Sequence, residues 1–153
     1  MDRQQYLYLD AKASVKRMLT TFIEDMKKKN LSLDLQYFDL DAHADASEVP
    51  ETDIIALQGF SGIFEEKFID ISFNVGVSTF NDSENTRHDA IMSHLVGRLY
   101  PMETIELVTY DGGIPYGSLI IRGTTDVSPF AKTNIRPIQF CLVETKSTET
   151  IKL

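Results

Sequence analysis

The chain has 153 residues, of which 42% are hydrophobic and 25% charged, and its formal net charge at pH 7 is −8. This composition is that of an ordinary globular protein, excludes a disordered chain, and at this length favours one domain. So acidic a chain would repel nucleic-acid phosphates, which argues against ordinary DNA or RNA binding. The charged N-terminal segment does not read as a secretory signal and no apolar run reaches a membrane-spanning length, so we expect assembly in the cytosol.

The first half of the chain begins with a helical pattern. Asp10 is a candidate N-cap for a helix that runs to about Lys29. Apolar residues recur in it at three- and four-residue steps and share one face: Ala11, Val15, Met18, Leu19, Phe22 and Met26. Residues 31–37 then alternate between apolar and polar, which predicts a half-buried strand, and residues 53–60 predict a second one.

The clearest strand is "FIDISFNVGVSTF" at residues 68–80. From Ile69 to Ser78 its apolar residues alternate with polar residues and one glycine, which is typical of a sheet that is covered on one side only. A second helix is predicted over about residues 84–99, with possible caps in "NDSENT" and an apolar face of Ile91, Met92, Leu95, Val96 and Leu99.

Three more strands are predicted after this helix. They lie near residues 103–110, 117–125 and 138–145, and the Asp-Gly pair in "DGGIPYG" predicts a turn between the first two. The resulting order is α-β-β-β-α-β-β-β. It predicts a single α+β domain over residues 1–145, with a mixed, mainly antiparallel sheet and two helices, followed by a polar tail at 146–153.

An acidic stretch at residues 39–53 is the first candidate site, since carboxylates and an imidazole alternate at its start: Asp39, Asp41, His43 and Asp45. A calcium loop beginning at Asp39 would need Gly and Glu where Ala44 and Pro50 stand. A catalytic zinc ion would need more than one good nitrogen or sulfur ligand. The spacing therefore predicts no metal and favours an acidic surface loop that serves as a contact surface.

Other potential chemistry is sparse. "GFSG" at 59–62 is close to a nucleophile elbow, but Ile63 stands where the final Gly is needed, so a tight turn at Ser61 is the simpler interpretation. Cys141 lies in an apolar run and predicts a buried, inert thiol rather than a nucleophile. His88 and His94 are six residues apart on one predicted helix, which separates them too far around the axis to share a metal.

A basic stripe of Arg87, His94 and Arg98 is the second candidate site. These side chains flank the apolar face of the second predicted helix. One interpretation is that they are solvated charges beside the core. The other is that they contact an acidic surface on a neighbouring subunit.

The order of these elements and the pattern of apolar and polar residues within them resemble those of tail terminator proteins of long-tailed bacteriophages over about residues 5–145. The segments that carry the resemblance are "FIDISFNVGVSTF", "ENTRHDAIMSHLVGRLYP", "IELVTYDGGIPYGSLIIRG" and "PIQFCLVETK". The resemblance implies a virion protein that forms a hexameric ring, caps the tail tube, ends its polymerisation and meets the head connector. It implies no enzyme and no cofactor.

Two other functions stay open at this point. One is a head–tail neck or baseplate adaptor built on similar principles. The other is a small metal-dependent hydrolase that uses the alternating acidic cluster. In the terminator interpretation DNA passes through the ring without specific binding, and we expect acidic side chains to line the channel: Asp39, Asp41 and Asp45 first, and Asp70 next.

Overall fold

The computed structural model describes residues 6–31, 36–40, 51–64, 68–132 and 136–147. Two helices and six strands follow one another as α1 (Leu7–Lys28), β1 (Gln36–Asp39), β2 (Ile54–Phe64), β3 (Ile69–Ser78), α2 (Thr86–Arg98), β4 (Thr104–Val108), β5 (Pro115–Lys132) and β6 (Pro137–Ser147). This is the predicted order, and the α+β fold is confirmed.

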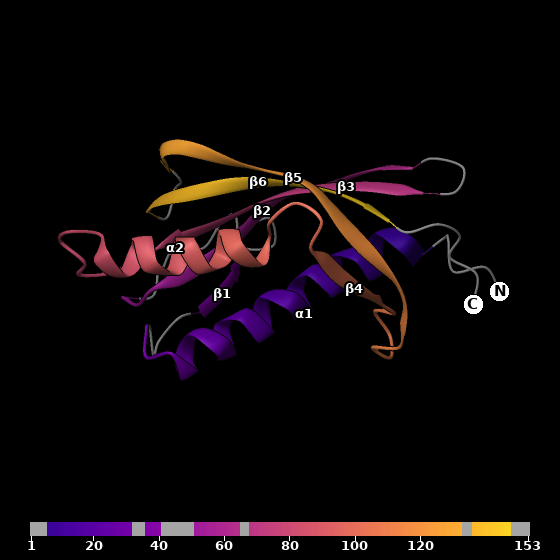
Figure 1. Cartoon of the computed structure of the whole chain (residues 1–153), viewed down its shortest axis with the longest axis horizontal. Helices are drawn as coiled ribbons and strands as arrows, with labels where there is room; N and C mark the ends of the chain where they lie inside the picture. The colour runs from indigo at the N-terminus through magenta and orange to yellow at the C-terminus, as the bar shows by residue number, and fades with distance from the viewer. Residues whose placement is uncertain (1–5, 32–35, 41–50, 65–67, 133–135, 148–153) are drawn as a thin grey trace.

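The strands form one twisted sheet in the order β1-β2-β3-β6-β5-β4. β1 and β2 are parallel, and every other neighbouring pair is antiparallel. The central pair joins distant parts of the chain, since Asp70 of β3 lies opposite Lys146 of β6. Both helices lie on the same side of this sheet (Figure 1).

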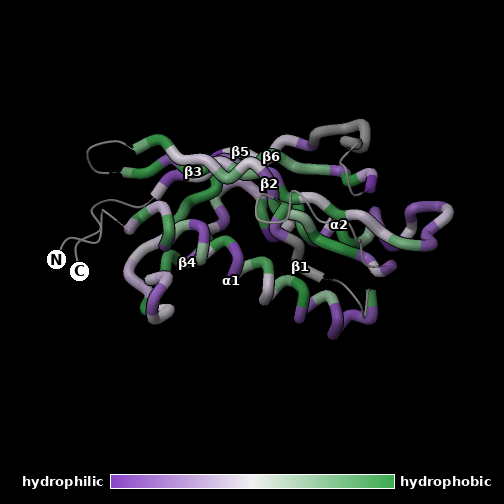
Figure 2. Tube along the Cα trace, turned by 180° about the vertical axis from the view of Figure 1, so that it is seen from behind, coloured by the Kyte–Doolittle hydropathy of each residue, from purple (hydrophilic) through white to green (hydrophobic). Residues whose placement is uncertain are grey.

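The main core lies between the sheet and the two helices. The six apolar residues predicted to share one face of α1 are all buried, and so are four of the five predicted on α2; the fifth, Val96, is partly buried against the same core. Along α1 hydrophobic and hydrophilic residues alternate as an amphipathic helix requires (Figure 2). In the described part of the chain, neither helix combines the length and apolar character needed to cross a membrane.

Asp10 does not cap α1, contrary to the prediction. The helix begins at Leu7 after Tyr6, with no side-chain cap, and Asp10 is fully buried one turn inside it. Its carboxylate accepts hydrogen bonds from the Tyr110 N–H, at 2.8 Å, and from the Tyr116 hydroxyl. Asp10 therefore fastens α1 to the hairpin of β4 and β5.

The opposite face of the sheet is only partly polar. A second, smaller cluster of buried apolar side chains lies on it, made of Leu40, Ile54, Ala56, Ile138 and Phe140. Gly76 of β3 sits beside it: a Cβ there would lie 2.5 Å from the Gln139 carbonyl oxygen, so β3 and β6 need a glycine at this position. The prediction of a sheet covered on one side alone is therefore wrong at this end.

Several predicted boundaries also move. The first strand is β1, which begins at Gln36 and includes Asp39; residues 32–35 lie outside the described ones. The segment read as a turn at Ser61 is a β-bulge inside β2, with Gly59 at a φ of +66°. β5 is longer than predicted, and β6 takes in Lys146 and Ser147 from the predicted polar tail.

Candidate functional site

A groove runs between α1 and α2 and continues toward β4. Its first part has a volume of about 350 Å³ and is lined by Phe22, Asp25, Met26, Lys28, Lys29, His94 and Arg98. The second part, of about 250 Å³, shares three of these side chains and adds Ser14, Arg17, Met18, Thr21, Ile105 and Glu106. Because Phe22, Asp25 and Arg98 line both parts, we treat them as one continuous feature and call it the helix groove.

Helical spacing explains how the sequence builds the helix groove. Phe22 and Met26 are four residues apart on α1, and Lys29 follows three residues later, so successive turns face the same side. His94 and Arg98 have the same four-residue spacing on α2. Phe22 and Met26 are buried and supply the apolar base of the groove, while the charged side chains stand at its rim.

The helix groove is basic although the chain is acidic. Four lining cations, Arg17, Lys28, Lys29 and Arg98, face two lining carboxylates, Asp25 and Glu106, a formal difference of +2 where the whole chain carries −8. Two of the cations are also held by backbone: Arg17 donates to the Gly113 carbonyl at 3.4 Å and Arg98 to the Thr104 carbonyl at 3.2 Å. An apolar base with a cationic rim suits an acidic segment of a protein partner.

The predicted basic stripe is split by the structure. His94 and Arg98 come together in the helix groove, but Arg87 is engaged elsewhere in the same chain. Its guanidinium donates to both carboxylate oxygens of Asp53, from Nε at 3.0 Å and from Nη2 at 2.9 Å, and Nη2 also donates to the Phe80 carbonyl. The hydrogen bond with Asp53 raises the pKa of Arg87, against partial desolvation. Arg87 is therefore a structural link between α2 and the start of β2.

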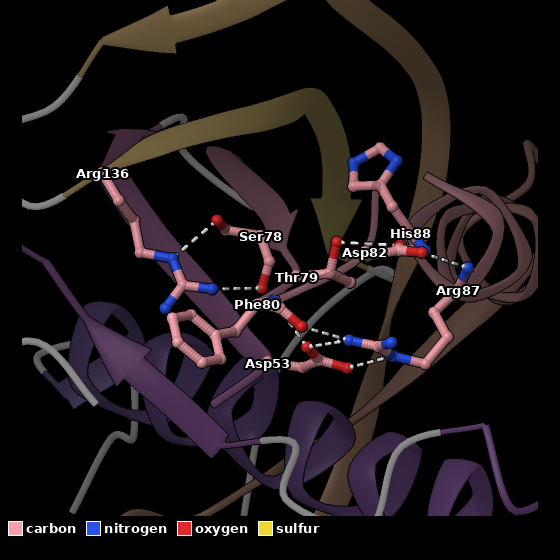
Figure 3. A network of polar contacts seen from close by, with 8 residues as sticks. All are labelled: Asp53, Ser78, Thr79, Phe80, Asp82, Arg87, His88 and Arg136. Carbon is pink, nitrogen blue, oxygen red and sulfur yellow. Dashed lines mark hydrogen bonds and ion pairs between the residues drawn. The ribbon is translucent and has the colours of Figure 1, made fainter. Parts of the chain in front are cut away.

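The start of α2 is surrounded by a polar network (Figure 3). Asp82 accepts hydrogen bonds from the backbone N–H of His88, at 2.9 Å, and from the Thr79 hydroxyl, at 3.0 Å. Desolvation opposes ionisation of this carboxyl, but these two bonds, with help from Arg87, lower the pKa of Asp82 below its ordinary value. Asp82 thus satisfies the first turn of α2, although Asn85 is the residue at the N-cap position.

Arg136 extends the same network toward β6. Its guanidinium donates to the Ser78 hydroxyl at 2.7 Å and to the Ser78 carbonyl at 3.1 Å (Figure 3). Desolvation lowers the pKa of Arg136, while the charge of Asp53 opposes that shift. The network therefore joins the ends of β2, β3 and β6 to the start of α2, and its role is to hold these elements together.

The acidic cluster predicted at residues 39–45 is described only at its first member. Asp39 ends β1 and is 3% exposed, and its carboxylate lies 2.8 Å from the Lys16 ammonium of α1. The prediction that Asp39 belongs to a solvated contact loop or lines a channel is therefore wrong, because β1 extends further than the alternation suggested. Asp41, His43 and Asp45 lie outside the described residues.

The other residues considered as nucleophiles or metal ligands have structural roles or lie apart from one another. Ser61 shares a hydrogen bond of 2.9 Å with Ser72 across β2 and β3. Cys141 is buried as predicted, and burial, together with the charge of Asp126, raises the pKa of its thiol to about 11. His88 is buried while His94 is exposed, and within the described ranges no three His, Cys, Asp or Glu residues are grouped so that they could hold a metal ion.

Sequence reasoning missed the contribution of α1 to the helix groove. The apolar spacing predicts Phe22 and Met26 on the buried face of the first helix, and it assigns no role in a site to Lys28 and Lys29. A signal was present, because these residues and His94 with Arg98 repeat at helical spacing, but the proximity of the two helices could not be inferred. The chain matches no family model and no curated protein.

Proposed function

We propose that the chain is a tail terminator of a long-tailed bacteriophage. In this role it is a structural virion protein, assembled in the host cytoplasm, that forms a homo-hexameric ring, caps the tail tube, ends its polymerisation and joins the tail to the head connector. The observation that carries the proposal is the element order α-β-β-β-α-β-β-β around one mixed sheet, because the resemblance to this family rests on that order. In this proposed role the chain is not an enzyme and needs no cofactor.

The helix groove supports a role in assembly. Neighbours in a ring contact each other through two different surfaces of the same chain. The helix groove is basic whereas the rest of the chain is acidic. Its charge is therefore complementary to the acidic surface of another copy of the chain.

The acidity of the chain fits the passage of DNA. Each Lys or Arg contact with phosphate adds affinity, so a channel lined by carboxylates would let DNA move without being held. The proposal for the channel now rests on Asp70, which is partly exposed on β3 at 3.9 Å from Arg122, and on Asp41 and Asp45, outside the described residues.

The test is the behaviour of the purified protein alone and with tail tubes. Light scattering after size-exclusion chromatography should give the mass of a hexamer, and negative-stain images should show rings. Added to polymerising tube protein, the rings should stop growth and bind tube ends. Monomers at high concentration with unchanged tube growth would contradict the proposal.

Two further measurements, of head-connector binding and of divalent-ion binding, separate the alternatives. Rings that bind the head connector without stopping tube growth would identify a neck adaptor. Stoichiometric binding of a divalent ion, lost on replacing Asp41 and His43, would favour the hydrolase.

A further inference from the structure

A tight turn at Tyr100–Glu103 connects α2 to β4. The Glu103 N–H donates to the Tyr100 carbonyl at 3.0 Å, and Met102 has a φ of +79°. With Pro101 in the second position and a positive φ in the third, this is a type II turn, in which glycine is the usual third residue. Met102 thus holds a backbone conformation that a side chain disfavours.

The turn is fixed to β5. The Met102 N–H donates to the Ile121 carbonyl at 2.8 Å, and the Ile121 N–H donates to the Glu103 carbonyl at 2.9 Å. The Thr124 hydroxyl donates to the Leu99 carbonyl at the end of α2. These bonds keep the strained conformation in place, so the turn is a rigid feature of the surface.

The turn presents apolar side chains to solvent. Tyr100 is 63% exposed, and Met102, at 79%, is the most exposed large apolar side chain among the described residues. A strained backbone conformation in a non-glycine residue is a feature that clusters at functional sites, and here it carries two large apolar side chains that are exposed. Their coincidence on one rigid turn indicates a surface that is buried by a partner.

We propose that this turn, Tyr100–Glu103, inserts into the helix groove of a second copy of the chain. Tyr100 and Met102 then lie in the helix groove, against the small part of its lining that Phe22 and Met26 leave exposed. Glu103 then meets the cationic rim, and exposed Lys29 is the member of the rim that we pair with it. The inference rests on the proposed ring, for which it supplies the contact between neighbours.

In the proposed ring the contact is head-to-tail, with the turn of one copy in the helix groove of the next. Within the described part of the chain, neither Tyr100 nor Met102 lines the groove of its own copy. Each copy would therefore offer its turn to one neighbour and its groove to the other, and such a contact can repeat around a closed ring.

A charge exchange tests the pairing. Glu103→Lys and Lys29→Glu should each weaken self-association about tenfold, as expected when a contact worth about 1.4 kcal/mol is lost. The double variant K29E/E103K should regain most of the lost affinity. Glu24→Lys, an exposed acidic residue of α1 outside the groove lining, is the matched control and should associate normally.

The variant Met102→Gly separates assembly from folding. Glycine suits the positive φ, so the isolated protomer should melt at a higher temperature than the wild type. Its self-association should nevertheless fall about tenfold, because the side chain that fills the partner's groove is gone. A Met102 with only a structural role would not give both changes.

Cross-linking gives the geometry. A chain with both Met102→Cys and Lys29→Cys should form a ladder of covalent oligomers with a short bismaleimide, while either single variant should not; buried Cys141 is not expected to react. Rings that form normally in E103K and M102G would overturn this contact but leave the proposed function standing. Absence of any self-association in the wild type would overturn the proposed function itself.

Discussion

Replacing Arg87 by Met tests whether this arginine is a structural link or an assembly residue. The Asp53 carboxylate, only 5% exposed, accepts two hydrogen bonds from Arg87 and a third from the Phe80 N–H at 2.8 Å. Arg87→Met removes the first two and leaves a buried carboxylate behind. Asp53→Asn removes the charge at the buried side but leaves an arginine that water can reach, since its side chain is 38% exposed.

The two variants should therefore differ in cost. Removing one partner of a fully buried pair destabilises a protein by about 3–5 kcal/mol. Partial exposure of Arg87 reduces this, and we expect about 2–3 kcal/mol for Arg87→Met. Asp53→Asn keeps the shape and an acceptor for the Phe80 N–H, so about 1–2 kcal/mol is expected.

Urea unfolding followed by circular dichroism measures both values. Arg122→Met is the matched control, because Arg122 is 59% exposed and 3.9 Å from Asp70, and it should change stability by less than about 0.5 kcal/mol. If Arg87→Met costs no more than this control, or less than Asp53→Asn, the structural assignment of Arg87 is refuted.

Three further predictions concern the core, the thiol and the acidic stretch. Leu95→Ala should lower the free energy of unfolding by about 2–5 kcal/mol in urea titrations, because Leu95 is fully buried on α2. Native Cys141 should stay unmodified by a thiol reagent at pH 8 and react in urea. The folded pKa of this thiol, about 11, lies above the unfolded value of 9.0, so its contribution to the free energy of unfolding should be complete below pH 9 and fall toward pH 11. The variant Cys141→Ala should lack this fall in stability with pH. Calorimetry with calcium, manganese and zinc should detect no binding tighter than millimolar, and a micromolar site abolished by replacing Asp41 and His43 would contradict the reading of that stretch.

The sequence predicted what local periodicity determines. The apolar faces of α1 and α2 and the inward residues of β3 follow from spacings of two, three or four residues, the turn after β4 follows from an Asp-Gly pair, and the structure confirms them. The order of elements follows from the same patterns. Buried Cys141 was predictable for the same reason, because it lies in an apolar strand.

Polar contacts between residues far apart in the chain could not be predicted from the sequence. Asp10 resembles a cap by its neighbours, and only the approach of Tyr110 and Tyr116, about a hundred residues away, makes it a buried anchor. Arg87 resembles a surface cation until Asp53 is brought beside it. The helix groove likewise depends on how far apart two helices pack, which no local pattern encodes.

The central position of β6 has a consequence for how the chain folds. β6 pairs with β3 on one side and with β5 on the other, so among the described strands it alone connects the hairpin of β2 and β3 to β4 and β5 by backbone pairing within the sheet. During synthesis the open edge of β3 must wait until β6 has been made. Contacts so distant in sequence slow folding, and we expect a chain truncated before Pro137 to expose that edge and aggregate.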